Sequence, residues 1–164
     1  MTLVNGVVLA RVGGGYRVHT DDGEITATLR GKLKYQDTER VVPGDVVVLE
    51  GTTIAEVRER KSVLARREPG SGARRLQPVA ANVDQVVVVA SARDPEPNPR
   101  MLDRILVIAE ANGLPATIVV NKNELDPGVA EEFARRFGTA EYQVLPTSVK
   151  AELGLPALRD LLRG

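Results

Sequence analysis

The apolar run "VDQVVVVASA" at residues 83–92 limits the possible folds more than any other stretch of the chain. It is continuous rather than alternating, which is typical of a strand that is covered on both faces. Strands are then expected over 116–120 and 142–148, and helices over 98–113, 126–138 and 154–162. This β-α-β-α-β-α order predicts a parallel sheet with right-handed crossovers, in which ligands bind at the carboxyl ends of the strands.

The N-terminal part of the chain has a different pattern, made of short strands separated by turn residues. The turn signals are Gly13-Gly14-Gly15, Asp22-Gly23 and Pro43-Gly44-Asp45. Strands are expected over 3–12, 16–20, 24–30, 41–50 and 53–60. About five short strands in some 60 residues suit a small closed barrel such as an OB-fold, and an SH3-like barrel fits the pattern nearly as well.

The two patterns predict two domains joined by a linker. We place the OB-fold at 1–62, the linker at 63–82 and the α/β domain at 83–164. The linker contains Gly, Pro and Ser together with two Arg-Arg pairs, and its lack of period indicates a mobile loop. Residues 1–75 carry 13 Lys/Arg and 10 Asp/Glu, whereas residues 76–164 carry 9 and 12. Net charges of opposite sign suggest two modules with different partners, although the excess is small.

Composition limits the chemistry that the chain can support. There is no Cys, and the single His19 cannot supply a zinc site, which usually needs four Cys/His ligands. No apolar stretch approaches the ~18 residues of a membrane span and no signal peptide opens the sequence, so we expect a cytoplasmic protein. An enzyme of unrelated chemistry lacks support, because no paired carboxylates, metal cluster or nucleophile–base set is present.

Polar residues follow directly after the expected strand "ATIVV", in the stretch "NKNE" (121–124). Guanine presents two adjacent donors, N1–H and the N2 amino group, and a carboxylate such as Glu124 can accept from both. Adenine presents an acceptor at N1 instead, and a buried carboxylate can reject such a wrong base by about 10⁴. Asn121 can bond the O6/N7 edge or tie two strand-end loops together, and the stem of Lys122 can lie across the base.

A second polar loop, with Ser148, Val149 and Lys150, follows the next expected strand and can offer a backbone N–H to guanine O6. Both loops fall at the same edge of one predicted parallel sheet, with a helix between them. The sequence therefore predicts a guanine site at this edge. The alternative for "NKNE" alone is a polar turn that binds nothing.

The sequence lacks a motif that could hold the phosphates of a nucleotide. A phosphate loop needs Gly-x-x-x-x-Gly-Lys-Ser/Thr, whose backbone N–H groups surround the anion. Gly31-Lys32 is followed by Leu33, and Gly70-Ser71-Gly72 has no Lys after it. Neither stretch fits, and no plausible Mg²⁺ site is found, so we expect no catalytic residues in these 164 residues.

Several longer stretches resemble one protein family across essentially the whole chain. "RGKLK" and "VVPGDVV" resemble its N-terminal OB-fold, and "RRLQPVAANVDQVVVVAS" resembles the start of its GTPase domain. "IVVNKNEL" and "PTSVKAELGLPALRDLL" resemble its two base-reading segments. The family is the circularly permuted, ribosome small-subunit-dependent GTPases of the RsgA/YjeQ group.

The resemblance implies an order of motifs that explains the missing phosphate loop. In the family the guanine-reading loops come first, and the phosphate loop follows the helix that here ends at Leu162-Arg163-Gly164. We therefore expect an N-terminal fragment that lacks the phosphate loop, the switch segments and the C-terminal zinc domain. It would bind GTP or GDP weakly and hydrolyse nothing by itself, and Mg²⁺ and structural zinc would belong only to the intact family protein.

Two residues depart from the family pattern at the expected base site. The family usually has Asp where this sequence has Glu124, and the extra methylene moves the carboxylate outward. The second loop often reads Ser-Ala-Lys, whereas here Val149 stiffens it. A backbone contact from this loop to O6 is compatible with either sequence.

The resemblance also implies a role for the whole protein and its partners. The protein would bind the small ribosomal subunit late in assembly and hydrolyse GTP there, as a monomer. Its barrel and linker would contact rRNA, mostly at phosphates, through Arg30, Lys32, Lys34, Arg58, Arg60, Lys61, Arg66 and Arg67. The alternative is a non-catalytic RNA-binding adaptor that binds no nucleotide.

Overall fold

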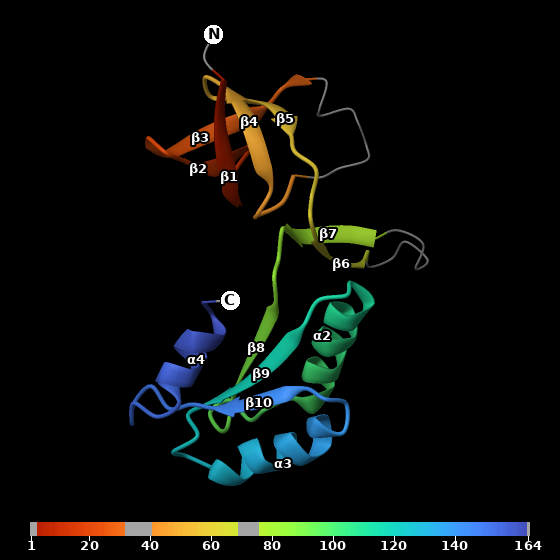
Figure 1. Ribbon diagram of the computed structural model, residues 1–164, viewed down its shortest axis with the longest axis vertical. Helices are drawn as coiled ribbons and strands as arrows, with labels where there is room; N and C mark the ends of the chain where they lie inside the picture. Colours follow the sequence, from red (N-terminus) through yellow and green to blue (C-terminus); the bar gives the residue numbers. More distant parts are fainter. Residues whose placement is uncertain (1–2, 32–40, 69–75, 164) are drawn as a thin grey trace. The chain divides into compact units, whose positions relative to one another are not determined.

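A computed structural model of the chain describes residues 3–31, 41–68 and 76–163 (Figure 1). The chain divides into two compact units, Met1–Val83 and Asp84–Gly164, called here the N-terminal and C-terminal units. Lys32 and Lys34, two of the expected RNA contacts, lie outside the described residues.

The N-terminal unit contains a closed five-stranded barrel. Its strands follow the order β1-β2-β3-β5-β4, with β3 and β5 parallel and the other neighbouring pairs antiparallel. The five barrel strands are β1 (Leu3–Val12), β2 (Gly15–Thr20), β3 (Gly23–Leu29), β4 (Val46–Glu50) and β5 (Thr53–Val57). Alternate residues point inward, and Val8, Val18 and Ile54 are at most 1% exposed in the barrel core. The predicted OB-type barrel is confirmed.

The segment expected to be a linker is not an irregular loop throughout. Strands β6 (Val63–Arg67) and β7 (Leu76–Ala81) pair as an antiparallel hairpin within it. The register shifts between Leu64 and Ala65, where Ala65 lies opposite Pro78. A bulge and a proline break the two-residue period, so the sequence pattern concealed both strands. The expectation of a structureless linker over 63–82 was therefore wrong for these two stretches.

Hydrogen bonds tie this hairpin to the barrel within the N-terminal unit. The Asn82 amide donates to the Gly44 carbonyl (2.8 Å), while its Oδ1 accepts from the Lys61 backbone N–H (2.9 Å). The Ala81 N–H donates to the Pro43 carbonyl (2.9 Å). Gly44 has φ of +88°, and a Cβ at this residue would lie 2.0 Å from the Ala81 carbonyl oxygen. Only glycine lets the two backbones approach this closely.

A buried ion pair joins the segment before β4 to the segment after β5. The Asp45 carboxylate is fully buried and accepts from Arg60 at 2.7 and 2.9 Å. It also accepts from the Val42 backbone N–H at 2.8 Å. Arg60 was expected to contact RNA, but its side chain is only 9% exposed and is used inside the unit. We therefore remove Arg60 from the candidate RNA contacts.

The C-terminal unit is built on a three-stranded parallel sheet with the order β10-β9-β8. Its elements are β8 (Val86–Ser91), α2 (Pro99–Ala111), β9 (Ala116–Asn121), α3 (Pro127–Gly138), β10 (Gln143–Pro146) and α4 (Leu155–Leu161). Helices α2 and α3 bury Leu102, Leu106, Phe133 and Phe137 in one core with residues of β8 and β9. The predicted parallel α/β arrangement is confirmed.

The two longer helices begin at the residues that the sequence indicates. Asn98 caps α2 by accepting from the Met101 N–H (3.2 Å), and Asp126 caps α3 by accepting from the Gly128 N–H (3.2 Å). Each cap is followed by proline at the first helical position, where no backbone N–H is needed. These starts fix where the loops after β8 and β9 end.

A candidate guanine site at the ends of strands β9 and β10

The two polar loops predicted from the sequence meet at one edge of the C-terminal sheet. The Thr147 N–H donates to the Val120 carbonyl (2.8 Å), which continues the pairing of β10 with β9. Beyond the strands, the Asn123 N–H donates to the Thr147 carbonyl (3.0 Å). The loops that contain Asn121–Glu124 and Ser148–Lys150 are therefore joined directly by backbone hydrogen bonds.

Asn121 links these loops through its side chain. Its Oδ1 accepts from the Thr147 hydroxyl (3.3 Å), and its backbone carbonyl accepts from the Ala92 N–H (2.8 Å). Of the two roles expected for Asn121, the structure supports the tying of the strand-end loops. This bond uses the amide oxygen and does not use the amide nitrogen, which can donate to a ligand.

Lys122 spans from the end of β9 to the loop after β8. Its φ is +58°, and its ammonium donates to the Asp94 carbonyl. A lysine at positive φ is uncommon, and such residues concentrate in turns and functional loops. This hydrogen bond ties the end of β9 to the loop after β8.

The second loop is a tight turn organised by Ser148, which is fully buried. Ser148 and Leu153 exchange backbone hydrogen bonds of 2.9 Å in both directions, and the Ser148 Oγ accepts from the Ala151 N–H (2.9 Å). Because the Ser148 N–H is used within the turn, the backbone donors that this loop can offer to guanine O6 are those of Val149 and Lys150. Both residues are exposed.

Glu124 lies beside this turn as an exposed side chain. A hydrogen bond from the Ser148 hydroxyl is the main cause that lowers the pKa of the Glu124 carboxyl below its usual value, with smaller contributions from its own backbone N–H, Lys150 and Lys122. The group is therefore a carboxylate at neutral pH, as guanine recognition requires. Its exposure differs from the buried carboxylate on which the expected 10⁴ discrimination depended, so water competes for the base and discrimination will be weaker.

The sequence interpretation assigned no role to three residues of this site. Thr147 is 2% exposed and bonds Asn121, and the buried Oδ1 of Asn123 has no hydrogen-bond partner among the described residues. Gly154 has φ of +69°, and a Cβ there would lie 2.2 Å from the Pro146 carbonyl oxygen. Only Gly154 carries a signal in the sequence, because a glycine before a helical pattern often marks a special backbone conformation.

The described residues supply no ligand set for a metal ion. Among residues 3–31, 41–68 and 76–163, no group of three or more His, Cys, Asp or Glu side chains could hold one. No helix in the same ranges is long and apolar enough to cross a membrane.

The candidate RNA-contacting residues all belong to the N-terminal unit and differ in their surroundings. Arg30 pairs with Glu50, and Arg58 pairs with Glu56 at 2.8 Å. Lys61, Arg66 and Arg67 are exposed. Within the described part of the chain, Arg66 and Arg67 form no ion pair, so both guanidinium groups can meet a phosphate.

The fold and the strand-end loops define a class of protein, in which an OB-type barrel is joined to an α/β domain of the GTP-binding type. The chain belongs to the family described as RsgA GTPase, whose family model matches residues 57–164, more than half of the sequence. The fold class and family predicted from the sequence are both confirmed.

Individual relatives agree with this assignment. Small ribosomal subunit biogenesis GTPase RsgA of Gemmatimonas aurantiaca is 44% identical over 170 residues, with 97% of this chain and 55% of the relative covered. The protein of the same name from Clostridium beijerinckii is 31% identical, with coverage of 98% and 53%. The chain thus spans about half the length of the curated relatives it matches.

Two solved structures share the fold. The crystal structure of YjeQ from Thermotoga maritima has a TM-score of 0.71 at 28% identity, and the match covers 98% of this chain and 57% of that one. The structure of YloQ, described as a circularly permuted GTPase, has a TM-score of 0.60 at 27% identity, with coverage of 99% and 56%.

Proposed function

We propose that this chain supplies the guanine-reading loops and an RNA-contacting barrel of a cytoplasmic GTPase that acts in the biogenesis of the small ribosomal subunit. The observation that carries the proposal is the joining of two polar loops at one sheet edge, through the Asn123–Thr147 and Thr147–Asn121 hydrogen bonds. The names of the relatives support the biological role.

In this proposal, Glu124 accepts from guanine N1–H and N2, and the N–H of Val149 or Lys150 donates to O6. The stem of Lys122 covers the base, and Asn121 with Ser148 holds the two loops in place. Since these loops contact only the base, the association entropy must be offset by few contacts, and we expect a Kd on the order of millimolar or weaker.

Guanosine and GTP should bind this chain about equally, and both more tightly than adenosine. Replacing Glu124 by Gln should abolish the preference for guanine, because an amide cannot accept from both donors, whereas Glu124→Asp should retain or strengthen it. Because the pKa of Glu124 is lowered, the preference should fade only as the pH falls through the value in the folded protein, which lies below the usual value for a glutamate. NMR titrations with the nucleosides measure this directly.

The matched control is Glu131→Gln, which removes an exposed carboxylate on α3 of the same unit. It should leave the preference unchanged. Equal shifts with guanosine and adenosine, or shifts far from Asn121 and Ser148, would favour the adaptor that binds no nucleotide.

The 164-residue chain should show no GTP hydrolysis above the buffer rate, with or without small ribosomal subunits. Its sequence provides no phosphate loop and no ligands for Mg²⁺, so nothing in it stabilises the charge that develops on the γ-phosphate. Release of inorganic phosphate is the measurement. Turnover that a substitution within these 164 residues abolished would contradict the expectation.

A second function, RNA binding, is favoured by the free guanidinium groups of Arg66 and Arg67. Binding to small-subunit rRNA should weaken steeply as salt rises. Replacing both arginines by Ala should reduce the magnitude of the log–log salt slope by up to about two, because each phosphate contact contributes nearly one.

The control for this measurement is Arg17→Ala, since Arg17 pairs with Glu24 in the N-terminal unit and is not among the candidate RNA contacts. This substitution should change the salt slope of rRNA binding less than replacing either Arg66 or Arg67 by Ala. A slope that the double substitution leaves unchanged would remove both residues from the RNA interface.

A further inference from the structure

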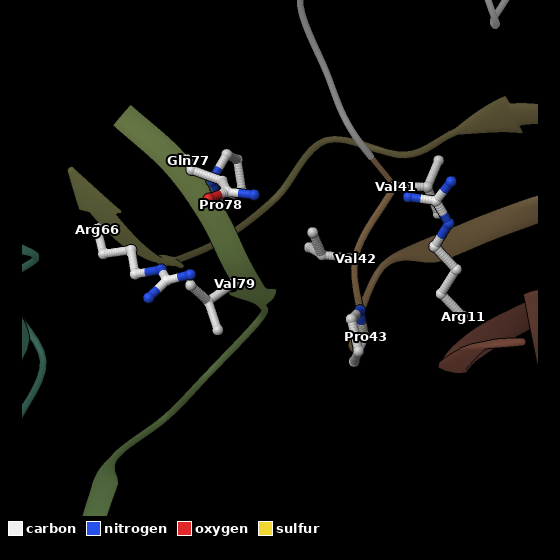
Figure 2. A pocket seen from close by; sticks show the side chains of 8 residues that line it. All are labelled: Arg11, Val41, Val42, Pro43, Arg66, Gln77, Pro78 and Val79. Carbon is white, nitrogen blue, oxygen red and sulfur yellow. The ribbon is translucent and has the colours of Figure 1, made fainter. Parts of the chain in front are cut away.

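The N-terminal unit contains a pocket of about 340 Å³ at the junction of barrel and hairpin (Figure 2). One wall is the segment before β4, with Val41, Val42 and Pro43, and the other is strand β7, with Gln77, Pro78 and Val79. Arg11 of β1 lies beside the first wall and Arg66 of β6 beside the second. The walls are largely aliphatic, and the two sides each carry one cation.

The charged residues that line the pocket are all positive. No Asp or Glu is among its eight lining residues. Four other arginines of the N-terminal unit have carboxylate partners, namely Arg17, Arg30, Arg58 and Arg60. Over the described ranges, the arginines of this unit that form no ion pair are Arg11, Arg66 and Arg67, and two of these three line the pocket. A ligand with anionic groups on both sides would complement this arrangement.

The pocket is also held in shape before any ligand arrives. The Ala81–Pro43 and Asn82–Gly44 hydrogen bonds join the two chain segments that form its walls. In a preformed site, little of the binding free energy is lost to the ordering of side chains and loops.

Size and shape then narrow the class of ligand. Pockets for small ligands begin near 300 Å³, so this one accommodates a single nucleotide and not a helical duplex. Proteins read RNA mainly at unpaired bases, which are placed against side-chain surfaces or guanidinium planes. Flat Pro43 and Pro78 can receive the faces of a base, and the Gln77 amide can both donate to and accept from its edge.

We infer that this pocket binds one unpaired nucleotide of an RNA strand, with the base between the two walls and the flanking phosphates on Arg11 and Arg66. The inference rests on the proposed RNA-binding function and adds the pocket as the place where one nucleotide of the RNA binds. The inference distinguishes Arg66 from its neighbour Arg67, which is also exposed but does not line the pocket.

The test uses the 164-residue chain and the 5′-phosphorylated dinucleotide pUpU, whose two phosphates flank one nucleoside and which carries no guanine. NMR signals of the Val41, Val42 and Val79 methyl groups and of the Gln77 amide should shift and saturate, with a Kd on the order of millimolar. Arg66→Ala and Arg11→Ala should each weaken binding by about tenfold, as loss of a charge-assisted hydrogen bond does. Arg67→Ala should weaken it less than about threefold, because Arg67 acts only through the screened field.

A second pair of variants tests the pocket without changing charge. Val79→Trp should fill it and prevent the shifts at Val41 and Val42, whereas Leu76→Trp, on the same strand but outside the lining, should leave them intact. The proposal is overturned if pUpU shifts none of these signals, or if inorganic phosphate alone shifts them equally. It is also overturned if the peptide acetyl-Asp-Leu-Asp-amide shifts them and pUpU does not, which would assign the pocket to an acidic protein segment.

These measurements separate the pocket from the broader RNA proposal. The salt slope of rRNA binding reports phosphate contacts wherever they occur, whereas the pUpU titration reports only this pocket. If the Arg66 and Arg67 double substitution left the salt slope of rRNA binding unchanged while pUpU still bound saturably, the proposed rRNA interface would be contradicted and the pocket would not.

Discussion

Replacing Asp45 by Asn should lower the free energy of unfolding of the N-terminal unit by about 3 kcal/mol or more. The Asp45 carboxylate is fully buried and accepts from Arg60 at 2.7 and 2.9 Å. Removing the negative charge leaves the guanidinium of Arg60, only 9% exposed, without the charge that offsets its desolvation. The same carboxylate accepts from the Val42 N–H, so the wall of the pocket should loosen as well.

Urea unfolding measures this effect when it is followed through methyl signals of the barrel core, such as those of Val8 and Leu49. The signals must come from the N-terminal unit alone, because the two units can unfold separately. A single free energy of unfolding for the whole chain would then not be defined. The matched control is Glu56→Gln, which breaks an exposed ion pair with Arg58 and should cost less than about 1 kcal/mol. Equal losses in the two variants would show that the buried pair contributes no more than a surface pair.

The alternation of strands and helices could be predicted from the sequence because each local pattern agrees with the tertiary fold. Asn98-Pro99 and Asp126-Pro127 both start helices where the sequence indicates. The exact face of a helix was harder to predict. Met101 of α2 is 47% exposed, whereas Leu106 of the same helix is 3% exposed. The run "ILVIA" at 105–109 is apolar all round, so its periodicity does not choose a face.

Contacts between residues far apart in the chain set the limits of prediction at the candidate site. Strand order alone brings Asn121 and Ser148 to one sheet edge, so their proximity could be predicted. The burial of Arg60 could not, because it depends on pairing with a carboxylate 15 residues away in the chain. Nor does the sequence indicate that Glu124 is exposed and bonded by the Ser148 hydroxyl, since both depend on how the second loop turns.

Replacing Gly154 by Ala should destabilise the C-terminal unit by about 3 kcal/mol. Its φ of +69° costs a residue with a Cβ roughly 1–2 kcal/mol, and overpacking a closed structure costs about 1–3 more. The added Cβ would lie 2.2 Å from the Pro146 carbonyl oxygen and 3.2 Å from the Thr147 Cγ2 atom. The first of these atoms belongs to the backbone of β10, so the strain cannot be relieved by rotating a side chain. Gly138→Ala is the control, since its Cβ would meet nothing within 4 Å.

The same substitution should alter the chemistry of the candidate site. Gly154 directly follows Leu153, whose backbone exchanges hydrogen bonds with Ser148, so a displaced Gly154 moves the serine that donates to Glu124. Because that bond favours the charged carboxylate, losing it should raise the pKa of Glu124 toward its usual value. Carboxyl NMR titration of Gly154→Ala against Gly138→Ala measures the change. If Gly154→Ala unfolded at the same urea concentration as the unsubstituted chain and left the pKa of Glu124 unchanged, the close approach of Gly154 to β10 would not be what holds the second loop in place.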